Sequence, residues 1–216
     1  MRIALIQPNG IIGDFEGNTK NILRSIAEAR SLGADLAVFP ELSVCGYPPR
    51  DFLEFQHFID QCEKAVDQIA KACCGIAAIV GSPVRNASGK GKPLYNAALF
   101  LYEGKIIGRQ YKTLLPNYDI FDEYRYFEPN REFGVVEFQG QKIGMTICED
   151  LWNTSSQPLY TQQPIHELAQ LKPDLLINIA ASPFHSHQHE ARMEILQFAA
   201  HLVHVPLIYV NQVGEH

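Results

Sequence analysis

The chain has 216 residues, of which 46% are hydrophobic and 19% are charged, and its formal net charge is −6. This composition is typical of a soluble globular protein and excludes disordered and collagen-like chains. The negative charge and the scattered Lys and Arg residues argue against a nucleic-acid partner. No apolar run reaches the roughly 18 residues of a membrane helix, and the N-terminal run is too short for a signal sequence. We therefore expect a cytoplasmic protein without a membrane partner, folded as one domain over residues 1–216.

Apolar runs typical of strands alternate along the chain with segments of helical periodicity. The expected strands cover residues 2–7, 35–40, 75–84, 94–102, 134–138, 142–148, 174–180 and 206–211. Apolar residues recur at helical spacing in three segments, which contain Ile22, Ile26 and Ala29; Phe55, Phe58, Ile59, Cys62, Val66, Ile69 and Cys73; and Ile195, Leu196, Ala199 and Leu202. Short turns at 102–105 and 138–142 are typical of hairpins. The pattern predicts an α/β sandwich with a mixed sheet and helices on its outer faces.

The five cysteines do not suggest a disulfide framework, because their number is odd and Cys73 and Cys74 are neighbours. Cys62 and Cys73 fit the apolar stripe of a helix. Cys45 and Cys74 have no chemistry assigned by the sequence.

Three reactive side chains follow apolar strand runs directly. Glu41 follows "LAVFP", Lys112 follows "KIIGRQY", and Cys148 follows "KIGMTI". Catalytic groups gather at strand ends in α/β proteins, so we expect these three to converge. A carboxylate base, a fixed cation and a thiol form a complete set for acyl transfer from an amide. The alternative for Cys148 alone is a small buried hydrophobic residue.

The segments around these residues carry a resemblance to a known family. They read "FPELSVCGYPPRD" (39–51), "YKTLLPNYDIFDEYRYFEP" (111–129) and "GMTICEDLWN" (144–153). In this order they resemble the signature blocks of the nitrilase superfamily of carbon–nitrogen hydrolases. More narrowly, the sequence is similar over almost its whole length to the glutaminase domains of glutamine-dependent NAD synthetases. The resemblance implies an α-β-β-α sandwich that forms homo-oligomers. The chain ends soon after the last expected strand, so we also expect it to be truncated at its C-terminus.

The resemblance also implies a role for each reactive residue. Cys148 would attack the side-chain amide of L-glutamine and form a γ-glutamyl thioester. Glu41 would accept the thiol proton and later activate water, and Lys112 would stabilise the tetrahedral intermediate. A second glutamate supports the lysine in this family; Glu123 is the best match and Glu128 the second choice.

By the same resemblance, five residues are expected to contact the substrate. Tyr118 and Glu149 would bind it, and the acid suits an α-ammonium group. Trp152 would form a pocket wall and Ser182 would line the far side. Tyr47 would shape the mouth of the site or simply pack.

In the related enzymes, ammonia passes to an ATP-consuming synthetase domain that amidates deamido-NAD, and that domain is absent from this sequence. We expect no cofactor in this chain, with ATP and magnesium used only by the synthetase domain. The segment "SGKGKP" (88–93) lacks the spacing of a phosphate-binding loop and indicates a solvated turn.

Asp150 and a group of histidines have no assigned chemistry. Asp150 has no role beyond capping the following turn. The segment "HSHQH" contains His185, His187 and His189, with His201 and His204 further on; it lacks a clear completing ligand, so we expect no metal site.

The sequence leaves three alternatives to a glutaminase. The first is a free-standing amidase that acts on another small amide. The second is an inactive interaction domain, and the intact Glu41, Lys112 and Cys148 argue against it. The third is a Cys-His protease, for which the sequence offers no signature.

Overall fold

Two mixed β-sheets face each other in the structure, a computed structural model that describes residues 1–153, 159–183 and 188–214. The first sheet has the order β1-β2-β3-β4-β5 and the second the order β6-β7-β8-β9. Their strands are β1 (Ile3–Leu5), β2 (Leu36–Val38), β3 (Ala77–Arg85), β4 (Leu94–Tyr102), β5 (Lys105–Tyr111), β6 (Val135–Phe138), β7 (Gln141–Ile147), β8 (Leu175–Ala180) and β9 (Leu207–Asn211). The predicted mixed sheet is therefore two sheets.

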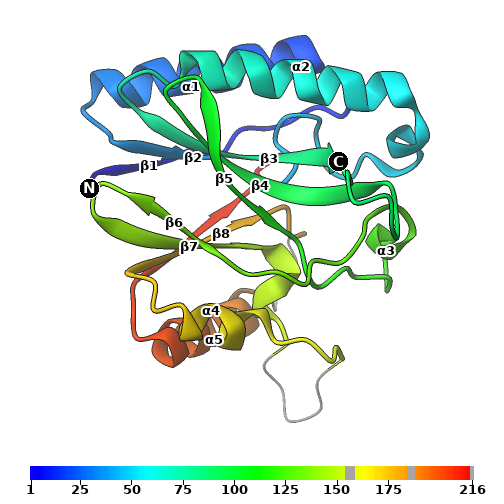
Figure 1. Ribbon diagram of the computed structural model, residues 1–216, viewed down its shortest axis with the longest axis vertical. Coiled ribbons are helices and arrows are strands. Elements are labelled where there is room, and N and C mark those ends of the chain that lie inside the picture. The colour runs from blue at the N-terminus through cyan, green and yellow to red at the C-terminus, as the bar shows by residue number, and fades with distance from the viewer. Residues whose placement is uncertain (154–158, 184–187, 215–216) are drawn as a thin grey trace.

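Helices cover the outer face of each sheet, which gives four layers (Figure 1). The outer helices are α1 (Phe15–Ser31) and α2 (Gln56–Ala72) on one side, and α4 (Pro164–Gln170) and α5 (Gln188–Val203) on the other. Shorter helical segments are η1 (Arg50–Glu54), α3 (Glu123–Tyr126) and η2 (Cys148–Leu151). The α-β-β-α sandwich implied by the resemblance is confirmed.

Strand alternation divides the core into layers. In β2, Leu36 and Val38 point between the sheets, whereas Ala37 points toward α1 and α2. Because successive side chains of a strand point to opposite faces, a strand buried on both sides is apolar throughout. This explains why β2 is apolar throughout and why every residue of β8 except Asn178 is apolar.

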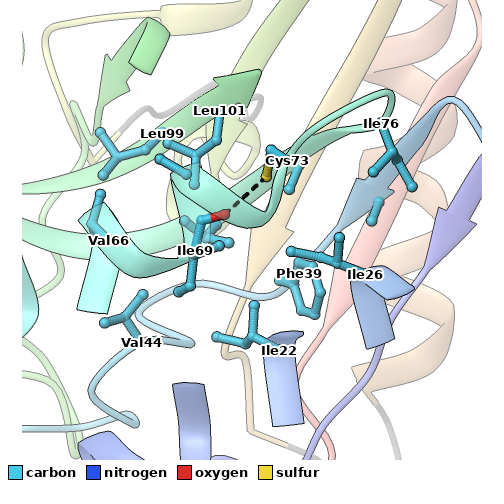
Figure 2. Packing of buried hydrophobic residues seen from close by; sticks show 14 of the residues in the cluster. Ile22, Ile26, Phe39, Val44, Val66, Ile69, Cys73, Ile76, Leu99 and Leu101 are labelled. Carbon is cyan, nitrogen blue, oxygen red and sulfur yellow. Dashed lines mark hydrogen bonds between the residues drawn. The ribbon is translucent and has the colours of Figure 1, made fainter. Parts of the chain in front are cut away.

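The predicted stripe of α1 and the Val66, Ile69 and Cys73 part of the second stripe are buried against the first sheet (Figure 2), whereas Phe58, Ile59 and Cys62 of α2 pack in a separate apolar cluster. Ile22 and Ile26 of α1 pack with Ile69 of α2, and Asp14 begins α1 by accepting a hydrogen bond from the N–H of Gly17. The expectation for Phe55 was wrong: it precedes α2 and is 61% exposed. A residue that precedes the first turn does not have helical backbone angles, so its side chain need not point in the direction of the buried stripe.

The strand directions place the reactive residues at the carboxyl ends of parallel strands. Strands β1, β2 and β3 are parallel, and β5 shares their direction because two antiparallel pairings separate it from β3. In the second sheet β7, β8 and β9 are parallel. The segments that follow β2, β5, β7 and β8 carry Glu41, Lys112, Cys148 and Ala181, which is the arrangement predicted for ligand sites in α/β proteins.

Candidate active site

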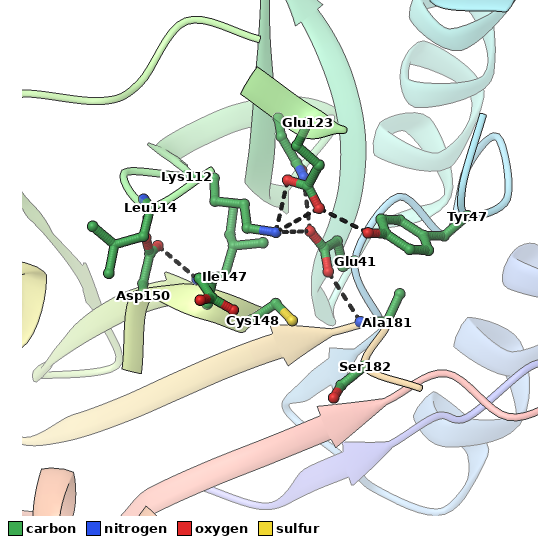
Figure 3. A network of polar contacts seen from close by, with 12 residues as sticks. Glu41, Tyr47, Lys112, Leu114, Glu123, Ile147, Cys148, Asp150, Ala181 and Ser182 are labelled. Atoms are coloured by element: carbon green, nitrogen blue, oxygen red, sulfur yellow. Dashed lines mark hydrogen bonds and ion pairs between the residues drawn. The ribbon is translucent and has the colours of Figure 1, made fainter. Parts of the chain in front are cut away.

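Lys112 lies at the centre of a buried ion-pair cluster (Figure 3). Its Nζ is 2.7 Å from Oε1 of Glu41 and 2.8 Å from Oε2 of Glu123. The side chains of Lys112 and Glu41 have no exposed area. Two carboxylates around one ammonium group satisfy charges that would be costly to bury alone.

Glu41 is fixed through both of its carboxylate oxygens. Oε1 accepts hydrogen bonds from Lys112 Nζ and from Asn96 Nδ2, the latter at 2.8 Å, and Oε2 accepts one of 3.0 Å from the N–H of Ala181. Asn96 lies on β4, and sequence reasoning missed it because a single Asn within an apolar strand carries no motif. The carboxylate is thereby oriented by three elements that are distant in the sequence.

Glu123 is the second carboxylate on Lys112. It begins α3, and its Oε1 accepts a hydrogen bond of 2.8 Å from the hydroxyl of Tyr47. Glu128, the second choice from the sequence, instead accepts a hydrogen bond from the N–H of Lys92. Of the two acids, the structure brings Glu123 against the lysine.

Cys148 is the first residue of η2, directly after β7, and is 6% exposed. Its φ is +42°, a left-handed conformation that is uncommon outside glycine and costs free energy. Figure 3 shows its side chain pointing to the side on which Glu41 and Ala181 lie. The bend at the strand end turns the thiol toward the side of the carboxylate, while Cys148 stays buried among the apolar residues between the sheets.

The pKa values of this cluster follow from burial and neighbouring charge. Burial and the charge of Glu41 raise the pKa of Cys148 well above its usual value, against the opposing effect of Lys112. Burial lowers the pKa of Lys112, but Glu123 and Glu41 outweigh burial and raise it well above its usual value. The resting site therefore holds a protonated thiol beside a permanent cation, and thiolate formation requires a base.

Glu123 has a pKa near neutrality. Burial raises the pKa of its carboxyl to about 7, with a further rise from Glu41 that Lys112 opposes. Burial likewise raises the pKa of the Tyr47 hydroxyl, which keeps it protonated as a donor to Glu123.

Glu149, the residue after Cys148, forms a second polar group with two tyrosines. Oε1 of Glu149 accepts hydrogen bonds from the hydroxyls of Tyr118, at 2.8 Å, and Tyr160, at 3.2 Å. Glu149 is 6% exposed, and no Lys, Arg or His side chain of the described residues forms an ion pair with it. A buried carboxylate with hydroxyl donors alone is suited to a cation from a ligand. Tyr160 was missed by sequence reasoning because it lies outside the three signature blocks.

Ser182 follows β8 and lines a large cavity. Its hydroxyl accepts a hydrogen bond of 3.0 Å from Nη2 of Arg192, and Nε of Arg192 is buried without a hydrogen-bond partner among the described residues. The cavity measures about 1120 Å³, and Ser182, Arg192, Tyr47 and Glu123 line it, whereas Cys148 does not. It therefore adjoins the cluster through Glu123, and Arg192 adds a cation to its lining.

Trp152 lies among apolar side chains, whereas Asp150 is surrounded by backbone N–H groups. Trp152 packs against Leu151 and Ile165 beneath α4 and α5. Asp150 is 3% exposed and accepts three backbone hydrogen bonds, two of which come from another segment. The cap suggested by the sequence accounts for only one of them.

The histidines do not form a cluster within the described residues. His189 lines the large cavity, and His201 and His204 are exposed at the end of α5. His185 and His187 lie outside the described residues. Across residues 1–153, 159–183 and 188–214, no group of three His, Cys, Asp or Glu side chains is placed to hold a metal ion. In the same ranges no helix has the length and apolar character needed to span a membrane.

Comparison with known proteins places this chain in a family. Residues 2–216 match the carbon-nitrogen hydrolase family. The sequence is 40% identical to a glutamine-dependent NAD(+) synthetase of Synechocystis, over 98% of this chain and 39% of that protein. It is 36% identical to the enzyme of the same name from Thermotoga maritima, over 99% of this chain and 36% of that protein. The chain thus spans less than two-fifths of the length of these relatives.

Solved structures agree on the fold. The glutamine-dependent NAD+ synthetase of Acinetobacter baumannii, in complex with ADP, matches 98% of this chain and 38% of its own with a TM-score of 0.88 and 33% identity. An amidase from Nesterenkonia matches 100% of this chain and 77% of its own with a TM-score of 0.81, at 21% identity. The latter likeness concerns the fold alone.

Proposed function

Because this chain belongs to the carbon-nitrogen hydrolase family, we propose that it hydrolyses the side-chain amide of L-glutamine at Cys148 and releases ammonia. The observation that carries the proposal is the position of Lys112, held at 2.7 Å by Glu41 and at 2.8 Å by Glu123 beside the strand-end cysteine. These three groups supply the base, the cation and the nucleophile of amide hydrolysis.

The first half of the reaction forms a thioester. Glu41 accepts the Cys148 proton as the sulfur bonds to the amide carbon, and the carbonyl electron pair moves to oxygen. The intermediate then collapses as the C–N bond breaks, and Glu41 returns the proton to the departing ammonia. The raised pKa of Cys148 makes this base necessary, since little thiolate exists without it.

The second half consumes water. Glu41 accepts a proton as a water molecule attacks the thioester, the C–S bond breaks, and the proton passes to the Cys148 sulfur. The products of the full cycle are glutamate and ammonia, so atoms and charge balance without a cofactor. Lys112 stabilises the oxyanion in both halves because its ammonium group stays charged.

Glutamine recognition requires one partner for each end of its α-amino-acid group. We assign the ammonium group to Glu149, whose Oε1 accepts hydrogen bonds from Tyr118 and Tyr160. Arg192, which holds Ser182 and lies in the cavity wall, supplies a cation for the carboxylate. An amide that lacks these two charges would leave Glu149 and Arg192 without a partner of opposite charge, which disfavours its binding.

The fate of the ammonia belongs to the same proposal. The relatives that this chain matches are named glutamine-dependent NAD(+) synthetases, and the chain corresponds to a part of each. We propose that the ammonia serves an ATP-dependent synthetase domain that amidates deamido-NAD, and that this domain uses the ATP and magnesium.

The proposal is tested with 6-diazo-5-oxo-L-norleucine, a diazoketone that mimics glutamine and alkylates thiols. Intact mass and peptide mapping should find one adduct, on Cys148, and excess glutamine should slow its formation. The exposed Cys74 is an internal control for nonspecific reaction. Ammonia release should be seen with glutamine but not with asparagine. Release from an unrelated small amide, with no protection by glutamine, would favour the free-standing amidase.

A further inference from the structure

We propose that Asp150 is a positioning residue that ties the lysine segment of the site to its cysteine segment. Oδ1 accepts hydrogen bonds of 2.9 Å from the N–H groups of both Thr113 and Leu114, directly after Lys112. Oδ2 accepts a hydrogen bond of 3.0 Å from the N–H of Ile147, directly before Cys148. One carboxylate thus joins the backbone on either side of the two reactive residues (Figure 3).

The pattern differs from that of a turn cap. A cap satisfies N–H groups of its own turn, whereas two of the three bonds of Asp150 reach residues 36 and 37 positions earlier. Thr113 and Leu114 follow β5 of the first sheet, whereas Ile147 ends β7 of the second sheet. Asp150 therefore fixes the distance between two segments that no strand pairing connects.

The position of Cys148 requires such support. Its φ of +42° is an unfavourable backbone conformation for a residue with a side chain, and it persists only where neighbouring contacts hold it. The peptide N–H of Ile147 is part of that bend, and Asp150 fixes it. The same carboxylate holds Thr113 and Leu114, so a shift on either side would move the thiol relative to Lys112.

The burial of Asp150 costs desolvation free energy, which a purely structural link would not require. Asp150 is 3% exposed, and burial raises its pKa to about 7, although the hydrogen bonds from Leu114 and Ile147 act in the opposite direction. Backbone N–H groups can be satisfied by neutral acceptors at lower cost. A charged acceptor brings stronger and shorter hydrogen bonds, which suits a contact that must hold a strained nucleophile in place.

The test compares Asp150→Asn and Asp150→Ala with Asp174→Asn. Asn retains an acceptor for Thr113 and Leu114 but turns an amide group toward the Ile147 N–H, and Ala removes both sides of the link. Asp174 is a matched control, because it also accepts a backbone hydrogen bond, from Lys142, at the opposite end of β7. The first readout is the rate of Cys148 alkylation by iodoacetamide as a function of pH.

We expect the alkylation profile of Asp150→Asn to shift to higher pH and its rate at neutral pH to fall about tenfold, because the thiolate loses part of its charge interaction with Lys112. Asp150→Ala should shift further, and Asp174→Asn should match the unaltered protein. In glutamine hydrolysis kcat should fall about 100-fold with little change in KM, as for a misplaced catalytic group. Unchanged profiles, or equal losses in the Asp174 control, would overturn the proposal.

The inference rests on the proposed glutaminase function only for the kcat readout. If the unaltered protein fails to hydrolyse glutamine, the alkylation profiles still decide whether Asp150 positions the thiol. If neither Asp150 variant folds, amide hydrogen exchange in the unaltered protein decides instead. Slow exchange at Thr113, Leu114 and Ile147 is expected, and fast exchange at these three amides would refute the link.

Discussion

The ammonium group of Lys112 lies 2.7 Å from Oε1 of Glu41, and neither side chain has any exposed area. The base and the oxyanion partner are therefore held together before any substrate arrives. Such preorganisation is the main source of electrostatic stabilisation in enzyme sites, because no group must reorient during the reaction.

Glu41→Gln should remove the base while retaining the shape of the side chain. Loss of a general base typically lowers turnover by about 10² to 10⁴-fold. We expect glutamine hydrolysis to fall within that range while Cys148 still reacts with the diazoketone, slowly. Ammonia release in a coupled assay measures the effect, and Glu137→Gln, on an exposed position of β6, is the control. Retention of full activity would exclude Glu41 as the base.

Lys112→Met should destabilise the fold as well as abolish activity. Removing one partner of a buried ion pair typically costs about 3 to 5 kcal/mol, because the remaining charge has no compensation. Here Glu41 and Glu123 would both lose their cation. Urea denaturation should show this loss, and the double variant Lys112→Met with Glu123→Gln should recover part of it. A double variant less stable than Lys112→Met would contradict the ion-pair explanation.

The rate of hydrolysis should rise with pH through about 7, where the carboxyl groups of Glu123 and Asp150 have their raised pKa values. Below this pH the carboxyl group of Glu123 is protonated, so Lys112 has one negative charge fewer beside it. Above this pH the Glu123 carboxylate is charged again. A profile of kcat/KM against pH measures the limb. If Glu123 is the group that titrates, Glu123→Gln should shift this limb of the pH profile. If Asp150 is that group, Asp150→Asn should shift it. A flat profile between about pH 6 and 8 would contradict both assignments.

The sequence predicted the layered fold and the three strand-end residues because both follow from local patterns. Apolar runs locate strands, and a reactive residue directly after such a run lies at the sheet edge, as Glu41 and Cys148 do. The two sheets were not separable by pattern, since their strands have the same apolar character on both faces. That division depends on which strands pair, which is set by contacts distant in the sequence.

The supporting residues of the site were harder to predict for a physical reason. Asn96, Tyr160 and Arg192 act through hydrogen bonds to groups that are remote along the chain or lie across loops. A polar residue inside an apolar strand or an ordinary helix carries no local signal of such a contact. The position of Asp150 two residues after Cys148 is visible in the sequence, but its hydrogen bonds to the segment after Lys112 cannot be deduced from spacing.

Tyr160→Phe should weaken glutamine binding more than it slows the chemistry. The hydroxyl lies 3.2 Å from Oε1 of Glu149 and helps to orient that carboxylate toward the proposed ammonium group. We expect KM to rise several-fold with kcat nearly unchanged, as for a group that binds ground state and transition state equally. Steady-state ammonia release measures both constants, and Tyr95→Phe, in a stacked pair with Tyr111, is the control. A fall in kcat without a change in KM would assign Tyr160 to the chemistry instead.

Arg192→Gln should raise KM for glutamine and reduce the preference for amides that carry a carboxylate. The guanidinium donates to Ser182 Oγ at 3.0 Å and lines the cavity, and its loss would leave a substrate carboxylate without a cation. Arg192 also donates to the backbone carbonyl of Pro183, at 3.3 Å. Arg30→Gln is a matched control, because Arg30, at the end of α1, donates to the backbone carbonyl of Cys74. Comparing KM for glutamine with KM for its α-carboxamide derivative separates two explanations. If Arg192 binds the carboxylate, the variant should lose the discrimination between the two substrates, whereas an equal rise in both KM values would mean that Arg192 only holds Ser182 in place.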